Sequence, residues 1–197
     1  MKRFTKLLGI IVIGAVIPAS AFALDWKAYP DAIKAGNIIV NAGVGFGTPL
    51  YGSMSIPPLI LSIDYALPIG GIPFTLGGFF GFNQSKYKYD YIAGYGYTYT
   101  YTGTAFGARL AYHPNFGVKN LDVYATFALG YYLYGAKAEY TGEWPTGTLK
   151  TSPAKYDTFY WGGNLGVRYF FTPKIGAWAE LGYSALSYIS AGITIKF

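Results

Sequence analysis

Residues 121–134, LDVYATFALGYYLY, alternate apolar side chains with polar or small ones. The odd-numbered positions are Leu121, Val123, Ala125, Phe127, Leu129, Tyr131 and Leu133, and the even-numbered positions are Asp122, Tyr124, Thr126, Ala128, Gly130, Tyr132 and Tyr134. We call each of these alternating sets a parity of the strand. In a β-strand, successive side chains point to opposite faces, so this stretch predicts a strand with one apolar face and one face that tolerates polar groups. The fold then depends on how often the pattern recurs.

The same alternation recurs seven more times. It covers residues 37–46, 59–65, 74–83, 105–112, 158–171, 175–184 and 187–197. Short connections at 68–73, 113–120 and 172–174 alternate with longer ones at 48–58, 90–97 and 141–157, and the last connection, 185–186, is short. Eight strands with short turns at one end and longer loops at the other are typical of a small outer-membrane barrel.

The composition fits a surface that does not need to be ionic. Apolar residues make up 52% of the chain, aromatic residues 20% and charged residues 12%, whereas soluble domains average about 25% charged residues. There are 21 Tyr, 27 Gly and no Cys, so disulfides and a lipid-attachment cysteine are excluded. The net charge is +6, and it falls to +3 (12 basic and 9 acidic residues) without Lys2, Arg3 and Lys6 of the N-terminal segment, which is too small and too scattered to indicate nucleic-acid binding.

The N-terminus has the features of a targeting segment. Three basic side chains within residues 2–6 precede an apolar run at 7–17, and an A-x-A sequence ends at Ala23. The run is shorter than the roughly 20 residues of a spanning helix, which favours a signal peptide, residues 1–23, over an uncleaved anchor. We predict cleavage after Ala23. Residues 24–35 are expected to be a short periplasmic segment with a helical turn, below or inside the barrel as a partial plug.

The apolar parity is expected to face lipid. The opposite parity carries Asp64, Arg109, Arg168 and Glu180, and a soluble barrel, which is apolar inside, would have to bury these charges. A closed barrel also satisfies every backbone group within a membrane. We therefore predict an all-β, eight-stranded, antiparallel, up-and-down transmembrane β-barrel over residues 36–197, located in the cell outer membrane.

Several stretches support this interpretation by resemblance. The sequences LDVYATFALGYYLYG and GNLGVRYFFTPKIGAWAELGYS and the final strand resemble the outer-membrane β-barrel family of small eight-stranded OmpA/OmpX-type proteins. The resemblance implies that Phe197, Ile195 and Ile193 form a signal for the outer-membrane assembly machinery. It also implies outer-membrane lipid as a partner.

The predicted lumen is narrow. Eight strands enclose an interior just wide enough to be filled by side chains. Asp64, Arg109, Arg168 and Glu180 are expected to form a lumen charge network, because charges in a partly dry interior must pair. We predict an Arg168–Glu180 pair first and an Asp64–Arg109 pair second. The alternative is an ion-selective constriction or gate.

Residues 86–102, KYKYDYIAGYGYTYTYT, contain seven tyrosines: Tyr87, Tyr89, Tyr91, Tyr95, Tyr97, Tyr99 and Tyr101. Strands at 74–89 and 98–112 would exceed the roughly 9–11 residues that cross a membrane, so this hairpin is expected to project beyond it. The tyrosines either form an aromatic girdle and pack the hairpin, or make a recognition surface together with Trp144 of the following loop.

No enzymatic motif is found. The sole histidine, His113, lies in a Pro-Asn turn on the periplasmic side and is expected to be solvated. No G-x-S-x-G, HExxH or carboxylate cluster occurs, so catalytic residues, metal sites and cofactors are not expected.

Two function classes stay open. The first is a non-enzymatic, monomeric protein of structural or surface-interaction role, serving envelope integrity or adhesion to an extracellular ligand or host surface. The second is a narrow channel or transporter of small molecules across the outer membrane.

Overall fold

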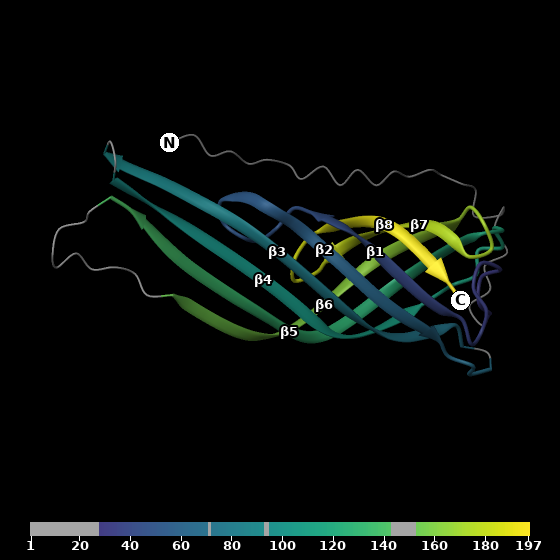
Figure 1. Cartoon of the computed structure of the whole chain (residues 1–197). Helices are drawn as coiled ribbons and strands as arrows, with labels where there is room; N and C mark the ends of the chain where they lie inside the picture. The colour runs from purple at the N-terminus through teal and green to yellow at the C-terminus, as the bar shows by residue number, and fades with distance from the viewer. Residues whose placement is uncertain (1–27, 71, 93–94, 143–152) are drawn as a thin grey trace, which may run out of the picture.

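The computed structural model describes residues 28–70, 72–92, 95–142 and 153–197. Eight strands form a closed barrel in which each is hydrogen-bonded to the next and β8 returns to β1 (Figure 1). Their bounds are β1 Ile38–Phe46, β2 Ser53–Ala66, β3 Phe74–Ile92, β4 Tyr95–Tyr112, β5 Leu121–Thr141, β6 Ala154–Phe170, β7 Ile175–Tyr183 and β8 Ile189–Lys196. In the part of the chain that is described, no helix is long and apolar enough to cross a membrane.

All neighbouring strands are antiparallel, and closure leaves the start of β1 and the end of β8 at one end of the barrel. The β1–β8 register runs from Ile39 opposite Lys196 to Phe46 opposite Ile189. It continues past β8, where the Phe197 amide donates to the Ile38 carbonyl at 2.8 Å. We call this end, which also carries the β2–β3, β4–β5 and β6–β7 connections, the turn end.

The alternation sorts side chains as the sequence predicts. Large apolar residues such as Leu61, Phe127 and Leu165 are exposed on the outside of the barrel, at 48%, 49% and 69% of their surface. Charged and polar residues of the opposite parity are buried inside, and Arg168 has no exposed surface. The barrel is therefore apolar outside and polar inside, which is the arrangement of a membrane barrel rather than a soluble one.

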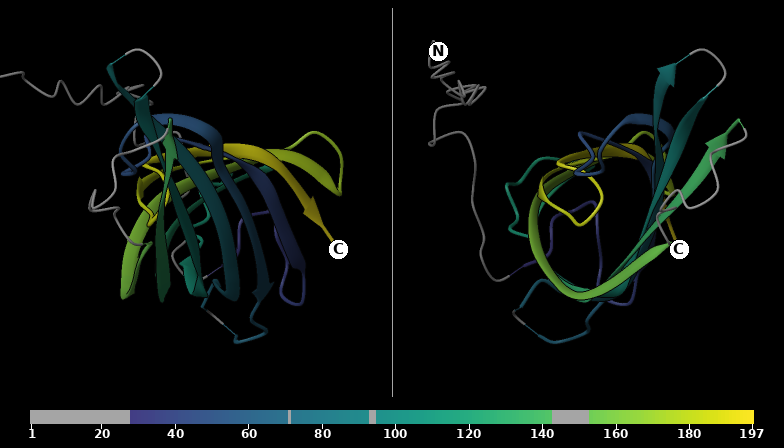
Figure 2. Two further views of the ribbon diagram at one scale, coloured as in Figure 1. Left: turned by 60° about the vertical axis from the view of Figure 1, so that its left-hand side comes forward. Right: turned by 90° about the vertical axis from the view of Figure 1, so that its left-hand side faces the viewer.

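The strands differ greatly in length. β3, β4 and β5 have 19, 18 and 21 residues, whereas β1, β7 and β8 have nine, nine and eight. The additional residues of β3, β4 and β5 extend away from the turn end, on one side of the barrel (Figures 1 and 2). We call this the raised end.

The β3–β4 hairpin at the raised end is longer than predicted. Sequence reasoning placed a loop at residues 90–97, but the strand pairing continues to Ile92 opposite Tyr95. β2 also begins earlier than expected, at Ser53, with register shifts on both sides of Ile56. The second shift spans two consecutive prolines, Pro57 and Pro58, which cannot donate to the strand ladder.

The start of the described chain closes the turn end. Ile33 is 1% exposed and clusters with Ala32, Ile39, Ala66 and Phe170. This segment is held by hydrogen bonds: the Tyr29 hydroxyl donates to the carbonyls of Leu67 and Phe74, and the Lys196 ammonium donates to the Ala32 carbonyl. The described part of the segment, residues 28–35, therefore lies against the turn end, and the partial plug expected of residues 24–35 stays a prediction. The signal peptide at 1–23 and the Ala23 cleavage site lie outside the described residues.

Candidate functional site: a sealed lumen and a tyrosine-faced sheet

The lumen holds a network of five charged side chains from five strands. Asp64 comes from β2, Arg109 from β4, Asp122 from β5, Arg168 from β6 and Glu180 from β7. All five are buried, with at most 6% of the residue exposed. Strand parity points each of them inward, and barrel closure brings them together although their sequence positions span more than half of the chain.

Arg168 is the centre of the network. Its Nη2 donates to Asp64 Oδ2 at 2.7 Å, its Nη1 to Asp122 Oδ2 at 2.9 Å and its Nε to Asn41 Oδ1 at 3.1 Å. The guanidinium carbon also lies 4.0 Å from the centre of the Tyr124 ring. Hydrogen bonds to ionised partners are among the strongest in proteins, so Arg168 ties four strands across the lumen.

Arg109 extends the network toward the raised end. Its Nη2 donates to Glu180 Oε1 at 2.8 Å, and its Nε forms an ion pair with Asp64 Oδ1 at 3.1 Å. The Tyr124 hydroxyl donates to the same Glu180 oxygen at 2.9 Å. The second predicted pair, Asp64–Arg109, is therefore present.

The first predicted pair, Arg168–Glu180, is wrong. The β6–β7 register puts Glu180 opposite Gly166 and puts Trp178 opposite Arg168. Glu180 therefore sits one inward position nearer the raised end than Arg168, where Arg109 reaches it from across the lumen. The sequence located β6 and β7 correctly. The spacing of residues within one hairpin, however, does not predict contacts between strands that are distant in the sheet.

The prediction of a solvated His113 is also wrong. His113 has no exposed surface; its Nδ1 lies 2.8 Å from Asp122 Oδ1 and its Nε2 lies 3.0 Å from Thr75 Oγ1. The residue follows β4 directly and continues the β3–β4 ladder by one position, because its amide donates to the Pro73 carbonyl. His113 has the inward parity of Arg109 and Ala111. Sequence reasoning missed it because the predicted strand ended at residue 112, although extending the parity by one residue would have placed His113 inside the barrel.

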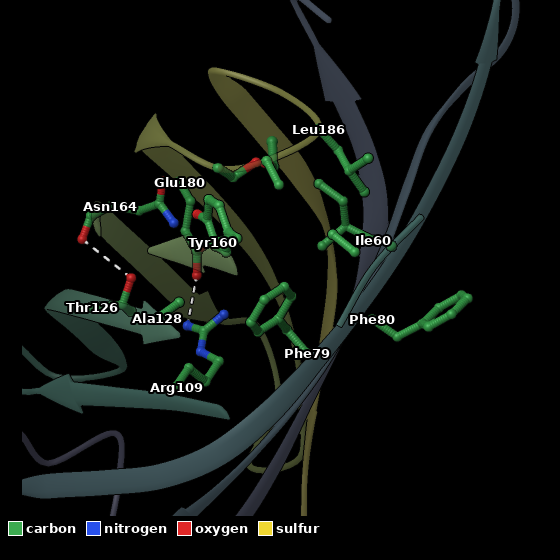
Figure 3. A pocket seen from close by; sticks show the side chains of 15 residues that line it. Ile60, Phe79, Phe80, Arg109, Thr126, Ala128, Tyr160, Asn164, Glu180 and Leu186 are labelled. Atoms are coloured by element: carbon green, nitrogen blue, oxygen red, sulfur yellow. Dashed lines mark hydrogen bonds and ion pairs between the residues drawn. The ribbon is translucent and has the colours of Figure 1, made fainter. Parts of the chain in front are cut away.

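An apolar layer lies above the charges. Leu186, in the connection between β7 and β8, is 3% exposed and packs with Ala105, Ala128 and Tyr160 inside the barrel. Figure 3 shows Leu186 and Phe79 on the lumen side, whereas Phe80 points away from it. The cavity left between this layer and the Arg109–Glu180 pair has a volume of only about 40 Å³.

A glycine makes room for this layer. A Cβ at Gly81 of β3 would lie 2.3 Å from Leu186 Cδ1, closer than such atoms can approach. The connection at residues 184–188 is tied inward by Ser184 Oγ, which donates to the Ser187 carbonyl at 2.8 Å. The β7–β8 connection, which is short in the sequence, therefore folds into the lumen and blocks it instead of forming an external loop.

At the raised end, β3, β4 and β5 continue as a three-stranded sheet. We call residues 84–92, 95–103 and 134–141 the raised sheet. Its side facing the barrel axis carries tyrosines, and three pairs of rings are stacked: Tyr89 with Tyr97 at 5.3 Å, Tyr99 with Tyr101 at 5.9 Å and Tyr101 with Tyr134 at 6.1 Å between centroids. Tyr51, from the β1–β2 connection, contacts Tyr87 at 5.0 Å and closes one margin of this tyrosine face.

The opposite side of the raised sheet changes from apolar to polar side chains along each strand. The last apolar side chains are Phe82 of β3, Phe106 of β4 and Leu133 of β5; Phe82 and Leu133 lie in the same row as Thr104, and Phe106 lies in the previous row of the same parity. Farther from the turn end, the described side chains of the same parity are polar apart from glycine: Gln84, Lys86, Lys88, Asp90, Thr98, Thr100, Thr102, Lys137, Glu139 and Thr141. The apolar band thus ends within two residues of one row on the three strands, which marks the edge of the surface suited to lipid.

The structure brings together most of the predicted surface tyrosines. Tyr87, Tyr89, Tyr97, Tyr99 and Tyr101 share the tyrosine face, and Tyr95 has the same parity. Desolvation, and then the nearness of other phenols, raises the pKa of Tyr97 and Tyr101 above the usual value of 10.0. The side chain of Tyr91 and all of Trp144 lie outside the described residues.

The predicted assembly residues lie on the outside of the closing strand. Ile193, Ile195 and Phe197 are exposed at 60%, 37% and 64% of their surface. Their recognition by the assembly machinery stays a prediction. Among the described residues, no group of three or more His, Cys, Asp or Glu side chains could hold a metal ion.

Comparison with known proteins identifies the fold. No protein-family model and no curated protein sequence matches the chain. Among solved structures, a major outer membrane protein from Thermus thermophilus is similar over 82% of this chain and 99% of its own, with 15% identity and a TM-score of 0.58. The chain has the fold of a small outer-membrane β-barrel.

Two further solved structures are less similar. The attachment invasion locus protein Ail of Yersinia pestis, in complex with the heparin analogue sucrose octasulfate, covers 82% of this chain and 97% of its own at 11% identity and a TM-score of 0.47. The N-terminal β-barrel domain of Pseudomonas aeruginosa OprF covers 82% and 98% at 13% identity and a TM-score of 0.45. The predicted eight-stranded, antiparallel, up-and-down transmembrane barrel is thus confirmed by the strand order and by the Thermus structure.

Proposed function

We propose that this protein is a non-enzymatic barrel of the cell outer membrane that holds the tyrosine face above the membrane to bind an extracellular partner. The observation that carries the proposal is that the outside of the sheet changes from apolar to polar on all three strands, beyond Phe82, Phe106 and Leu133. Beyond this change the raised sheet has a polar back and an aromatic front. An aromatic girdle alone would not need strands that continue for several residues past the lipid.

Tyrosine suits such a surface. Its ring gives a large contact area with few rotatable bonds, and its hydroxyl can hydrogen-bond to a partner. The rings are also held by one another: Tyr97 contacts Tyr99 at 5.1 Å and stacks on Tyr89. A surface fixed in this way loses little conformational entropy when a partner binds.

The channel alternative has less support. The lumen is crossed by the Arg168 and Arg109 network, covered by the Leu186 layer and closed at the turn end by Ile33. Charges that are paired within the protein in a narrow lumen hold it shut rather than solvate a passing ion. We expect no steady conductance when the folded protein is placed in a planar bilayer. Steady currents from the folded protein would favour the channel instead.

The proposal can be tested with whole cells that display the protein. Binding to immobilised collagen, fibronectin and heparin would be measured for the wild type and for a variant with Tyr87, Tyr97 and Tyr101 changed to Ser. The matched control changes Thr98, Thr100 and Thr102, on the back of the same sheet, to Ala. We expect only the tyrosine variant to lose binding, at equal protein levels in isolated outer membranes. Equal binding by all three proteins, or failure of the wild type to reach the outer membrane, would contradict the proposal.

A further inference from the structure

One edge of the raised sheet has no neighbouring strand. β2 pairs with β3 only as far as Ser53 opposite Lys86, whereas β3 continues along β4 as far as Ile92. Beyond Lys86, no strand of the described chain lies along the other side of β3, and Figure 1 shows the end of β3 on the outer margin of the raised sheet. We call residues 87–92 the free edge. Such an edge presents unpaired backbone groups to which another strand can be added.

The backbone groups of Lys88 and Asp90 point out of the free edge. In an antiparallel sheet, the amide and the carbonyl of one residue point to the same side of the strand, and those of the next residue point to the opposite side. The Gln84 carbonyl accepts from Ser55 Oγ of β2 at 3.2 Å, and the β3–β4 register is regular from Gln84 to Asp90. The Tyr89 carbonyl points the other way, toward β4. The amides and carbonyls of Lys88 and Asp90 therefore face the open side.

The side chains at these two positions carry opposite charges. Lys88 and Asp90 lie on the polar back of the raised sheet, where 68% and 66% of their side chains are exposed, and Lys88 Nζ lies 3.1 Å from Asp90 Oδ2. Lysine on an edge normally discourages the addition of a strand, because its charge would be placed beside a neighbour that does not pair with it. The free edge therefore favours a strand that places a carboxylate opposite Lys88 and a cation opposite Asp90.

The free edge of a second copy of this chain meets that requirement. When two such strands pair antiparallel with Tyr89 opposite Tyr89 of the other copy, each Lys88 lies opposite an Asp90. Both of these are hydrogen-bonded positions, where the two residues exchange two backbone hydrogen bonds, and opposite charges stabilise such cross-strand pairs. Registers centred on Lys88 or on Asp90 would instead place like charges opposite each other. The charge pattern thus selects one register.

The direction of the strands decides where the second copy comes from. Two barrels in one membrane are related by an axis perpendicular to it, so their β3 strands run in the same direction and equivalent like charges would lie side by side. Two copies in membranes that face each other have β3 strands that run in opposite directions. Antiparallel pairing then joins the two raised sheets into one continuous sheet with both tyrosine faces on the same side.

We propose that the free edge binds the free edge of a second copy on an opposing membrane and thereby joins the two surfaces. A single contact involves few residues, but many copies on each surface act together, because each contact raises the effective concentration for the next. The inference rests on the placement of the raised sheet outside the membrane proposed above. It does not depend on binding by the tyrosine face.

The test uses two variants whose free edges carry charge of one sign. Lys88→Asp leaves two carboxylates on the edge, and Asp90→Lys leaves two ammonium groups. Each protein is reconstituted in phosphatidylcholine vesicles that carry one of two dyes, and the association of vesicles is measured by two-colour coincidence. We expect wild-type vesicles to associate, vesicles of either variant alone to lose association, and a mixture of the two variants to regain it.

The matched controls make the same charge changes on the same side of β5. Lys137→Asp and Glu139→Lys alter an ion pair that is similarly exposed, with 67% and 63% of the two side chains accessible. They change the net charge of the protein by the same amounts as the two free-edge variants. We expect both controls to associate as the wild type does, alone and when mixed.

Several outcomes would overturn the inference. Wild-type vesicles that stay apart would show that the free edge does not join membranes, and association that survives in either free-edge variant alone would assign the contact to another surface. A mixture of the two variants that stays apart would refute the proposed register. Controls that lose association alone and regain it when mixed would show that net charge is responsible. Failure of the folded wild type to insert into vesicles would instead refute the membrane placement. Loss of collagen, fibronectin or heparin binding has no effect on this readout, so the two proposals fail separately.

Discussion

Replacement of Arg168 by Met should be the most destabilising single change in the lumen. Arg168 is fully buried and donates to Asp64, Asp122 and Asn41. In the variant, one oxygen of each carboxylate loses its ionic partner in a place that water does not reach. Removing one partner of a buried ion pair typically costs about 3–5 kcal/mol, so the folding equilibrium constant should fall by roughly a hundredfold or more.

The loss should not be complete, because each carboxylate keeps a second contact. Asp64 Oδ1 stays 3.1 Å from Arg109 Nε, and Asp122 Oδ1 stays 2.8 Å from His113 Nδ1. Adding Asp122→Asn to Arg168→Met removes one of the two stranded charges. We therefore expect the double variant to recover part of the loss, with a coupling free energy of about 0.5–3 kcal/mol.

The assay is equilibrium unfolding in guanidinium, with the barrel in detergent micelles. The folded fraction is read from tryptophan fluorescence and from the heat-dependent mobility of folded barrels on gels. Lys137→Met is the control, because the Lys137–Glu139 pair is exposed and its loss should leave the midpoint unchanged. If Arg168→Met unfolds at the same midpoint as Lys137→Met, the lumen is hydrated and the reasoning is refuted.

Three other outcomes are expected. Leu186→Ala should lower the free energy of unfolding by about 2–5 kcal/mol because Leu186 is buried in the lumen. Leu165→Ala, on the lipid side, should lower it clearly less in the same guanidinium titration, and equal losses would contradict the packing of Leu186 inside the barrel. His113→Phe should cost about 1–3 kcal/mol by leaving buried partners unsatisfied, and a more stable variant would argue against its two contacts. The raised pKa values of Tyr97 and Tyr101 mean that their contribution to stability is complete below pH about 10 and is lost as the pH rises through the folded-state pKa. In an ultraviolet titration, Tyr97→Phe with Tyr101→Phe should remove late-titrating phenols, and a curve that loses only phenols of ordinary pKa would refute the packing of the tyrosine face.

The sequence located the strands well because the signal is local. Alternation with a period of two residues fixes which side chains share a face, and this held for Asp64, Arg109, Arg168 and Glu180, all of which are inward. The contacts between side chains within the lumen are not local in the sequence. Arg168 donates a hydrogen bond to Asp64, which lies more than 100 positions away, and no spacing within one hairpin could predict that contact.

The connections were predicted least well. His113 was expected in solvent because the predicted strand ended at residue 112, but it continues the inward parity of that strand and is buried beside Asp122. The connection at 185–186 was predicted only to be short, and neither parity nor a turn motif indicates that Leu186 fills the lumen. Leu186 can pack there only after the barrel has closed around it.

The sequence by itself determined that this chain forms eight strands with an apolar outer face, because alternation and turn residues act over a few positions. The tertiary structure alone decided how the lumen is sealed, which carboxylates Arg168 and Arg109 meet, and how far β3, β4 and β5 extend beyond the shorter strands. Those features depend on the register and the unequal lengths of paired strands. Register and length are set by the whole ring of hydrogen bonds, and no single strand carries that information.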